Sequence, residues 1–198
     1  MKHSPRQAEV VRETAETQIT ARLKLDGQGQ VTVSTGLPFL DHMITALCRH
    51  AGFDLELRAV GDLEIDDHHT TEDCGIVLGQ ALREALGDKR GITRFGSAYA
   101  PLDEALARTV VDLSGRPWPV IECGFQRERL GTVATENLTH FLESLAIAAA
   151  MNLHVDVLRG RNDHHRAEAA FKATALALRA ACARRDDDRV PSTKEVLA

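Results

Sequence analysis

The sequence predicts an α+β fold built by internal duplication, and three observations support this prediction. The motif D-H-H-x-x-E occurs twice, at residues 67–72 and 163–168 of the 198-residue chain. Segments that alternate apolar and polar residues, as half-buried strands do, occur in both halves. Apolar helical segments follow them in the same order, so the repeat concerns the whole fold.

We therefore expect each half to have the order β-β-α-β-α, and the halves to form two mixed sheets with helices packed between or against them. The first half-repeat, with an N-terminal tail and the first motif, spans residues 1–93. The second half-repeat, with the second motif, spans residues 94–185. Residues 186–198 are expected to be a C-terminal tail, because the charged stretch at 184–189 is typical of a solvated loop.

The first half begins with a predicted β-hairpin. Residues 18–25 alternate polar and apolar side chains, the segment G-Q-G at 27–29 turns the chain, and residues 31–33 return it. An apolar helix is expected to follow from Leu40. A strand over residues 53–60 and a helix after the first motif, with apolar positions from Ile76 to Leu86, complete this half.

The second half repeats this pattern. Strands are predicted over residues 109–113 and 119–123, on either side of the turn S-G-R-P. An apolar helix opens near Leu138, and residues 153–158 alternate as a strand does. The apolar run that follows the second motif predicts the last helix.

Composition excludes several classes of protein. A hydrophobic content of 43% supports a sizeable core, and the net charge of −5 disfavours nucleic acid or a membrane surface as the principal partner. There is no long apolar segment and no signal peptide pattern, so we expect a cytoplasmic protein. The four cysteines lack C-x-x-C spacing and are expected to be buried, reduced thiols, which excludes Cys74 from the site.

Nitrogen and oxygen donors of the two motifs and of the two upstream helices form a candidate metal-binding set. A histidine and a glutamate three or four residues apart share one face of a helix. Two ions with about four such donors each would keep open positions on an octahedral metal such as manganese or iron, whereas structural zinc normally uses thiolates. The spacing does not divide the ligands between the ions. The set comprises His42, His68, His69, Glu72, His140, His164, His165 and Glu168.

Several further segments, in the same order, resemble the imidazoleglycerol-phosphate dehydratase family of histidine biosynthesis. They are E-T-Q-I at 16–19, F-L-D-H-M at 39–43, D-H-H-T-T-E-D at 67–73, T-R-F-G at 93–96, D-E-A-L-A-R at 103–108, S-G-R-P at 114–117, D-H-H at 163–165 and E-A-A-F-K-A at 168–173. The resemblance covers nearly the whole chain.

The resemblance implies a hydro-lyase with two manganese ions per active site. Its small-molecule substrate would be the phosphorylated imidazole D-erythro-1-(imidazol-4-yl)glycerol 3-phosphate, converted into 3-(imidazol-4-yl)-2-oxopropyl phosphate. Glu16, Glu168 and His69 are the implied catalytic residues, and either glutamate could be the acid or the base. The implied phosphate-binding residues are Arg94, Arg116, Lys172, Ser192 and Lys194, and His50 is expected to border the site.

The resemblance also implies a homo-oligomer of 24 subunits with octahedral symmetry and with active sites at subunit interfaces. It further implies that the C-terminal tail, residues 186–198, is a flap that orders over the phosphate. The chain begins too close to its first strand for a fused phosphatase domain, so we expect a monofunctional enzyme. Two alternatives use the same ligands. A dimetal hydrolase would activate water, and a metal-storage shell would bind ions without substrate.

Overall fold

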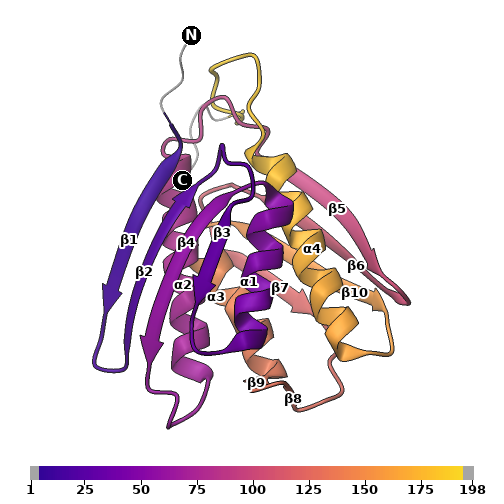
Figure 1. Ribbon diagram of the computed structural model, residues 1–198. Coiled ribbons are helices and arrows are strands. Elements are labelled where there is room, and N and C mark those ends of the chain that lie inside the picture. Colours follow the sequence, from indigo (N-terminus) through magenta and orange to yellow (C-terminus); the bar gives the residue numbers. More distant parts are fainter. Residues whose placement is uncertain (1–4, 194–198) are drawn as a thin grey trace.

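The computed structural model describes residues 5–193, and its two halves repeat one order of elements (Figure 1). The first half comprises β1 (Gln7–Glu13), β2 (Thr17–Lys24), β3 (Val31–Ser34), α1 (Pro38–Ala51), β4 (Asp54–Gly61) and α2 (His68–Leu86). The second comprises β5 (Phe95–Leu102), β6 (Ala105–Asp112), β7 (Trp118–Glu122), α3 (Thr135–Ala148), β10 (Asn152–Arg159) and α4 (Asp163–Cys182), with the small hairpin β8 (Arg129–Leu130) and β9 (Val133–Ala134) before α3.

The two large sheets have the same topology. Their strand orders are β1-β2-β4-β3 and β5-β6-β10-β7, and in each only the last pair is parallel. The predicted α+β fold with two mixed sheets and an internal duplication is thereby confirmed. Each half contains one strand more than the predicted β-β-α-β-α order, namely β1 or β5.

The predicted hairpin of residues 18–33 is wrong, because β4 lies between β2 and β3. Asp54 contacts the loop that leads to β3. Its Oδ1 atom accepts hydrogen bonds from the backbone amides of Gln28 and Gln30, at 2.7 and 3.0 Å. The loop that follows β2 is therefore held around the start of β4, and β3 is placed on the far edge of that strand. In the second half, β7 likewise pairs with β10 and not with β6.

The two additional strands lie at sheet edges and have weak sequence patterns. Within β1 only Val10 is buried. The strand β5 contains small residues because it lies directly against α4: a Cβ atom added at Gly96 would stand 2.0 Å from the carbonyl oxygen of Ala177. Edge exposure and small side chains both remove the alternation that identifies a strand in a sequence.

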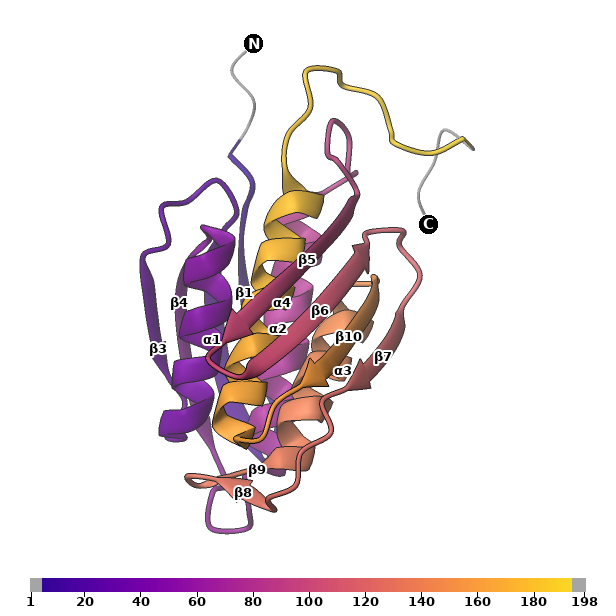
Figure 2. The ribbon, with the colours of Figure 1, turned by 90° about the vertical axis from the view of Figure 1, so that its right-hand side faces the viewer.

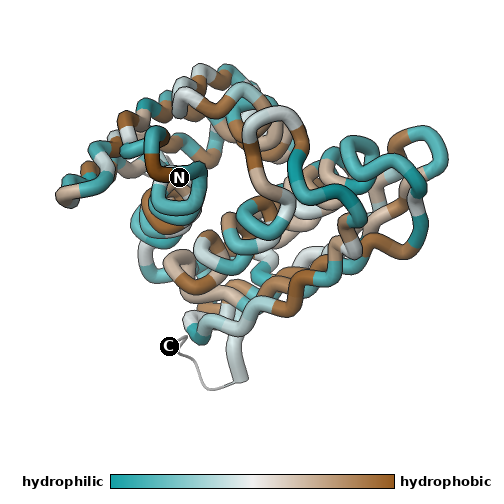
Figure 3. Tube along the Cα trace, turned by 90° about the horizontal axis from the view of Figure 1, so that it is seen from below, coloured by the Kyte–Doolittle hydropathy of each residue, from teal (hydrophilic) through white to brown (hydrophobic). Residues whose placement is uncertain are grey.

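The four helices lie between the two sheets (Figures 1 and 2). The inward positions of the strands are apolar, as Ile19, Leu57, Val111 and Val155 illustrate, and hydrophobic and hydrophilic residues alternate along the strands (Figure 3). The helix α2 packs on β1, β2 and α3, whereas α4 packs on β5, β6 and α1. Each helix pair thus combines one helix from each half. In residues 5–193, no helix has the length and apolar character needed to cross a membrane.

Two glycines allow α2 and α3 to approach closely. A Cβ atom at Gly75 would lie 2.7 Å from the carbonyl oxygen of Phe141, and one at Gly79 would lie 2.6 Å from that of Leu145. These contacts are with backbone, which cannot rotate away. The helices would have to separate to accommodate a methyl group.

We expect Gly79→Ala to lower the free energy of unfolding by about 1–3 kcal/mol, since overpacking outweighs the better helix propensity of alanine. Urea unfolding of the metal-free protein measures this change. Gln80→Ala, at the next and less buried position of α2, is the control and should leave stability nearly unchanged. Equal stability of Gly79→Ala and the wild type would contradict the close packing.

Candidate metal centre

All four helices begin at the same end of the molecule, the lower end in Figure 1. The candidate metal ligands lie there because His42 and His140 are in the early turns of α1 and α3, and the two D-H-H-x-x-E motifs open α2 and α4. The common direction of the helices therefore gathers side chains that are far apart in the sequence.

The first cluster consists of His42, His164 and Glu168, whose ligand atoms lie within 4.8 Å of one another. The Nε2 atoms of His42 and His164 are 3.1 and 2.9 Å from Oε1 of Glu168. One residue comes from α1 and two from α4, so the contact between these helices builds the cluster.

The second cluster consists of His68, Glu72 and His140, again within 4.8 Å. Nε2 of His140 lies 3.1 Å from Oε1 of Glu72, and the imidazole rings of His68 and His140 are stacked with centroids 5.1 Å apart. Each cluster thus combines a motif of one half with the upstream histidine of the other half. Each cluster therefore contains residues from both halves of the duplication.

Glu168 is held by several groups at once. Its Oε2 atom lies 2.5 Å from Nζ of Lys172, and its Oε1 atom contacts both histidines of the first cluster. Burial raises the pKa of Glu168, but the hydrogen bonds from Lys172, His42 and His164 outweigh it and lower this pKa to about 2. The carboxyl group is therefore ionised at neutral pH, as a metal ligand must be.

A polar network orients His68 in the second cluster. Nδ1 of His68 lies 3.0 Å from Oδ1 of Asn137, whose Nδ2 donates to the buried Asp67. Asp67 also accepts from Arg129 and from the amide of Ala134. This first residue of the motif therefore serves the fold. Asn137 is a functional candidate that the spacing of histidines did not reveal.

His69 and His165 belong to neither cluster. Nδ1 of His69 lies 3.0 Å from Oδ2 of Asp62, and Nδ1 of His165 lies 2.7 Å from Oε2 of Glu104. The hydrogen bond with Asp62 raises the pKa of His69, although desolvation opposes it. Each three-residue cluster thus lacks the fourth donor that the sequence predicts, while two motif histidines stand apart with carboxylate partners.

Glu16 is the second candidate catalytic carboxylate. It lies in the turn between β1 and β2, with its side chain 52% exposed and Oε1 3.8 Å from Nε2 of His69. His50 lies further along α1. Burial lowers its pKa, and the charge of Lys172 lowers it further.

The other candidate phosphate-binding residues lie at the opposite end of the molecule. The amide of Arg94 donates to the carbonyl of Ala181 near the end of α4. From Glu168 to Ala181 the helix rises roughly 20 Å. Arg116 follows the end of β6, where Asp112 pairs with Phe95, the residue after Arg94. Its side chain is exposed and has no ion pair within residues 5–193. Within one subunit, these arginines and the metal clusters are separated by the length of the helices.

Arg94 holds the segment before the C-terminus. Its guanidinium forms hydrogen bonds of 2.7 and 3.0 Å with Asp112, and Nη1 donates to the carbonyl of Pro191 at 2.8 Å, next to Ser192. The stretch 184–189 was predicted to be a solvated loop, yet the carbonyl of Gly91 accepts from Arg185 and its amide donates to Arg189. Lys194 lies outside the described residues.

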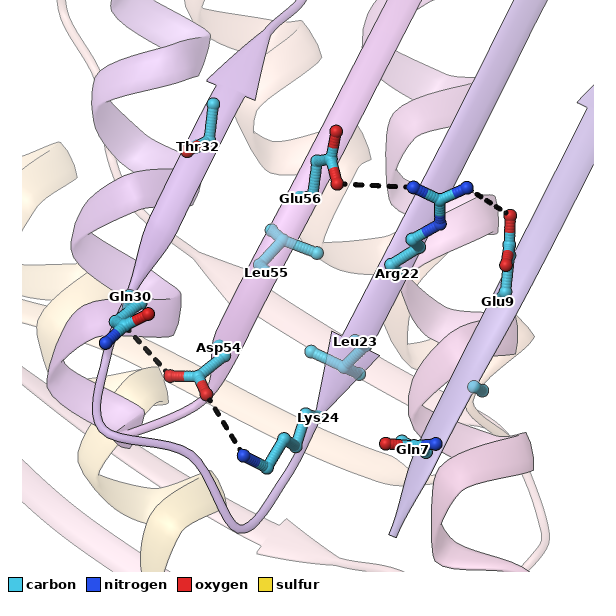
Figure 4. A pocket seen from close by; sticks show the side chains of 11 residues that line it. Gln7, Glu9, Arg22, Leu23, Lys24, Gln30, Thr32, Asp54, Leu55 and Glu56 are labelled. Atoms are coloured by element: carbon cyan, nitrogen blue, oxygen red, sulfur yellow. Dashed lines mark hydrogen bonds and ion pairs between the residues drawn. The ribbon is translucent and has the colours of Figure 1, made fainter. Parts of the chain in front are cut away.

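One groove in the described part of the chain lies away from both clusters. It has a volume of about 560 Å³ and lies on the outer face of the first sheet (Figure 4). Arg22 there pairs with Glu9 and Glu56, and Lys24 pairs with Asp54. Because these charges neutralise one another on an open strand surface, the groove lacks the convergent unpaired groups of a ligand site.

All four cysteines are buried and free, as predicted. Cys74 lies within α2, near the second cluster in sequence, and burial raises the pKa of its thiol. The thiol therefore stays protonated at neutral pH and does not compete with the histidines as a ligand.

Comparisons with known proteins identify the family of the chain. The family model of imidazoleglycerol-phosphate dehydratase matches residues 35–178. The chain is 61% identical to the imidazoleglycerol-phosphate dehydratase of Eremothecium gossypii, over 84% of this chain and 76% of the relative. It is 55% identical to that of Candida glabrata, over 96% and 99% of the two chains.

Two solved structures share the fold. The Staphylococcus aureus imidazoleglycerol-phosphate dehydratase superposes with a TM-score of 0.81 at 40% identity, over 90% of this chain and 99% of that one. The Pyrococcus furiosus structure, in complex with (S)-C348, superposes with a TM-score of 0.82 at 38% identity, over 95% and 100%. By sequence motifs, topology and overall similarity, the chain belongs to the imidazoleglycerol-phosphate dehydratase family.

Proposed function

We propose that this protein is a monofunctional, manganese-dependent dehydratase of L-histidine biosynthesis. It would remove water from D-erythro-1-(imidazol-4-yl)glycerol 3-phosphate to give 3-(imidazol-4-yl)-2-oxopropyl phosphate. The observation that carries the proposal is the pair of clusters, each with two imidazoles and one carboxylate, in a chain of this family. The four free thiols are consistent with work in the reducing cytoplasm.

The donor set of each cluster fits manganese. Two nitrogens and one oxygen leave open positions on an octahedral ion, and the described residues place no thiolate near them. When bound, the ions would supply Lewis-acid polarisation and a template for the imidazole ring of the substrate. His42, His164 and Glu168 would hold one ion, and His68, Glu72 and His140 the other.

The carboxylates would then have separate tasks. Glu168, with a pKa of about 2 and three partners, is fixed as an ionised ligand. Glu16 is exposed and can approach a substrate. It is therefore the better candidate for moving a proton between solvent and a carbon or oxygen atom of the substrate. His69, 3.8 Å from Glu16, lies where it can assist this transfer.

We propose that each active site is shared between subunits of a 24-subunit, octahedral assembly. A substrate with a three-carbon chain cannot span the roughly 20 Å of α4 that separates Glu168 from the position of Arg94. A neighbouring subunit would supply the phosphate-binding arginines. His69 and His165 of neighbours would likewise complete the three-residue clusters.

Turnover of imidazoleglycerol phosphate by chelated protein, with and without added manganese, tests the proposal. Manganese-dependent formation of the oxo product is expected, together with a large particle that chelation converts into smaller, inactive species. Hydrolysis of phosphate esters without dehydration would favour the dimetal hydrolase. Metal uptake without any turnover would favour the storage shell.

A further inference from the structure

Two carboxylates outside the D-H-H-x-x-E motifs contact the two histidines that the clusters leave out. Asp62 meets Nδ1 of His69 at 3.0 Å, and Glu104 meets Nδ1 of His165 at 2.7 Å. Both imidazole rings are partly buried, with 31% and 26% of the side chain exposed. The contacts therefore restrict rings that would otherwise turn freely.

Both carboxylates are themselves held in place. Oε1 of Glu104 accepts from the backbone amides of Arg161 and Asn162, at 2.9 and 2.8 Å, which directs Oε2 toward His165. The backbone of Asp62 is anchored on both sides, because its amide donates to the carbonyl of Glu16 and its carbonyl accepts from Ile65. Glu104 is thus fixed through its carboxylate, and Asp62 through its backbone.

The internal duplication does not account for this pairing. Asp62 lies in the connection from β4 to α2, whereas Glu104 lies in the turn from β5 to β6. The counterpart of the second turn in the first half is the β1–β2 turn, which contains Glu16 and not Asp62. The same contact has therefore been built twice from segments that do not correspond.

The chemical consequence concerns the other nitrogen of each ring. A carboxylate accepts a hydrogen bond from Nδ1–H. The tautomer with its proton on Nδ1 and a free electron pair on Nε2 is therefore favoured. Carboxylates placed in this way behind a metal-binding histidine fix its direction and increase its basicity. Carboxylate oxygens of Glu16 and Asp103 lie 3.8 and 3.9 Å from Nε2 of His69 and His165, beyond hydrogen-bond distance, so these contacts do not occupy either Nε2 atom.

We propose that Asp62 and Glu104 are positioning residues, which orient His69 and His165 so that their Nε2 atoms complete the metal clusters of neighbouring subunits. This inference rests on the proposed function for the metal itself. It adds two residues, outside the two D-H-H-x-x-E motifs, on which metal affinity and assembly depend. Neither carboxylate needs to touch the substrate.

The experiment titrates metal-free protein with Mn²⁺ in a calorimeter, without substrate. Asp62→Asn and Glu104→Gln should each weaken Mn²⁺ binding by about 10–100-fold and raise the Mn²⁺ concentration needed for assembly in gel filtration. The visible spectrum of Co²⁺-loaded protein should also change, because one imidazole per site becomes misplaced. Glu64→Gln and Glu122→Gln, the same chemical change at exposed positions of the same loop and of β7, should behave as the wild type.

Other outcomes separate this inference from the proposed function. Wild-type Mn²⁺ affinity and Co²⁺ spectra in both variants would overturn the positioning role, as would loss of binding accompanied by loss of folding in the metal-free thermal unfolding curve of both. A wild-type protein that binds Mn²⁺ in these titrations but fails to dehydrate the substrate would overturn the proposed reaction alone. A wild type that binds no Mn²⁺ would overturn both.

Discussion

Replacing Glu168 with glutamine is expected to reduce kcat/KM by about 10²–10⁴-fold, the range over which single catalytic groups contribute. Glutamine keeps the size and shape of the side chain but removes its charge. Three groups then lose their common partner: the two imidazoles of the first cluster and the ammonium group of Lys172. The first cluster would retain only neutral ligands beside an uncompensated cation.

The measurement combines steady-state kinetics with the number of Mn²⁺ ions bound per subunit. We expect that number to fall from two toward one, because the second cluster, on α2 and α3, shares no residue with the first. Glu84→Gln is the matched control, since it makes the same change at an exposed position of α2. Full Mn²⁺ occupancy and near wild-type turnover in Glu168→Gln would contradict the assignment of this residue as a ligand.

The parts of the fold that the sequence predicts are those whose residues alternate or repeat strongly. Strands β2, β4, β6 and β10 and all four helices bury one regular face, so their pattern is visible without a structure. The edge strands β1 and β5 escape this test, whereas the edge strands β3 and β7 are predicted because a turn precedes each of them. The order of strands in the sheet is missed because it rests on pairing between distant segments, such as β3 with β4, and the hydrogen bonds of Asp54 to the loop before β3 leave no mark in periodicity.

The same limit applies to the site. The motifs D-H-H-x-x-E identify candidate ligands because helical spacing is local. The division of these ligands into His42, His164 and Glu168 on one side and His68, Glu72 and His140 on the other depends on which helices pack together. The spacing of residues along the sequence cannot reveal a contact between the two halves of the duplication. Asp62 could have been suspected from its nearness to the first motif, whereas Glu104 is 61 residues from its histidine.

Arg116→Ala is expected to inactivate the enzyme alone but to complement Glu168→Gln when both chains enter one assembly. The reason is the roughly 20 Å of helix between the metal end and the arginine end of each subunit. If every active site takes its metal cluster from one subunit and its arginines from another, a random mixture contains sites in which both parts are intact. Such sites should make up about a quarter of the total in a symmetric assembly with interfaces formed at random.

Co-expression with two different affinity tags and sequential purification selects the mixed particles, whose specific activity is then compared with that of the wild type. A second mixture combines the wild type with the double variant Glu168→Gln/Arg116→Ala. The two mixtures together distinguish active sites shared between subunits from active sites within one subunit. Sites shared between subunits give about a quarter of wild-type activity in both mixtures, whereas sites within one subunit give none in the first and about half in the second. Both mixtures contain the same substitutions in the same amounts. A difference in activity between them therefore depends only on whether the metal cluster and the arginines of one active site come from the same subunit or from two subunits.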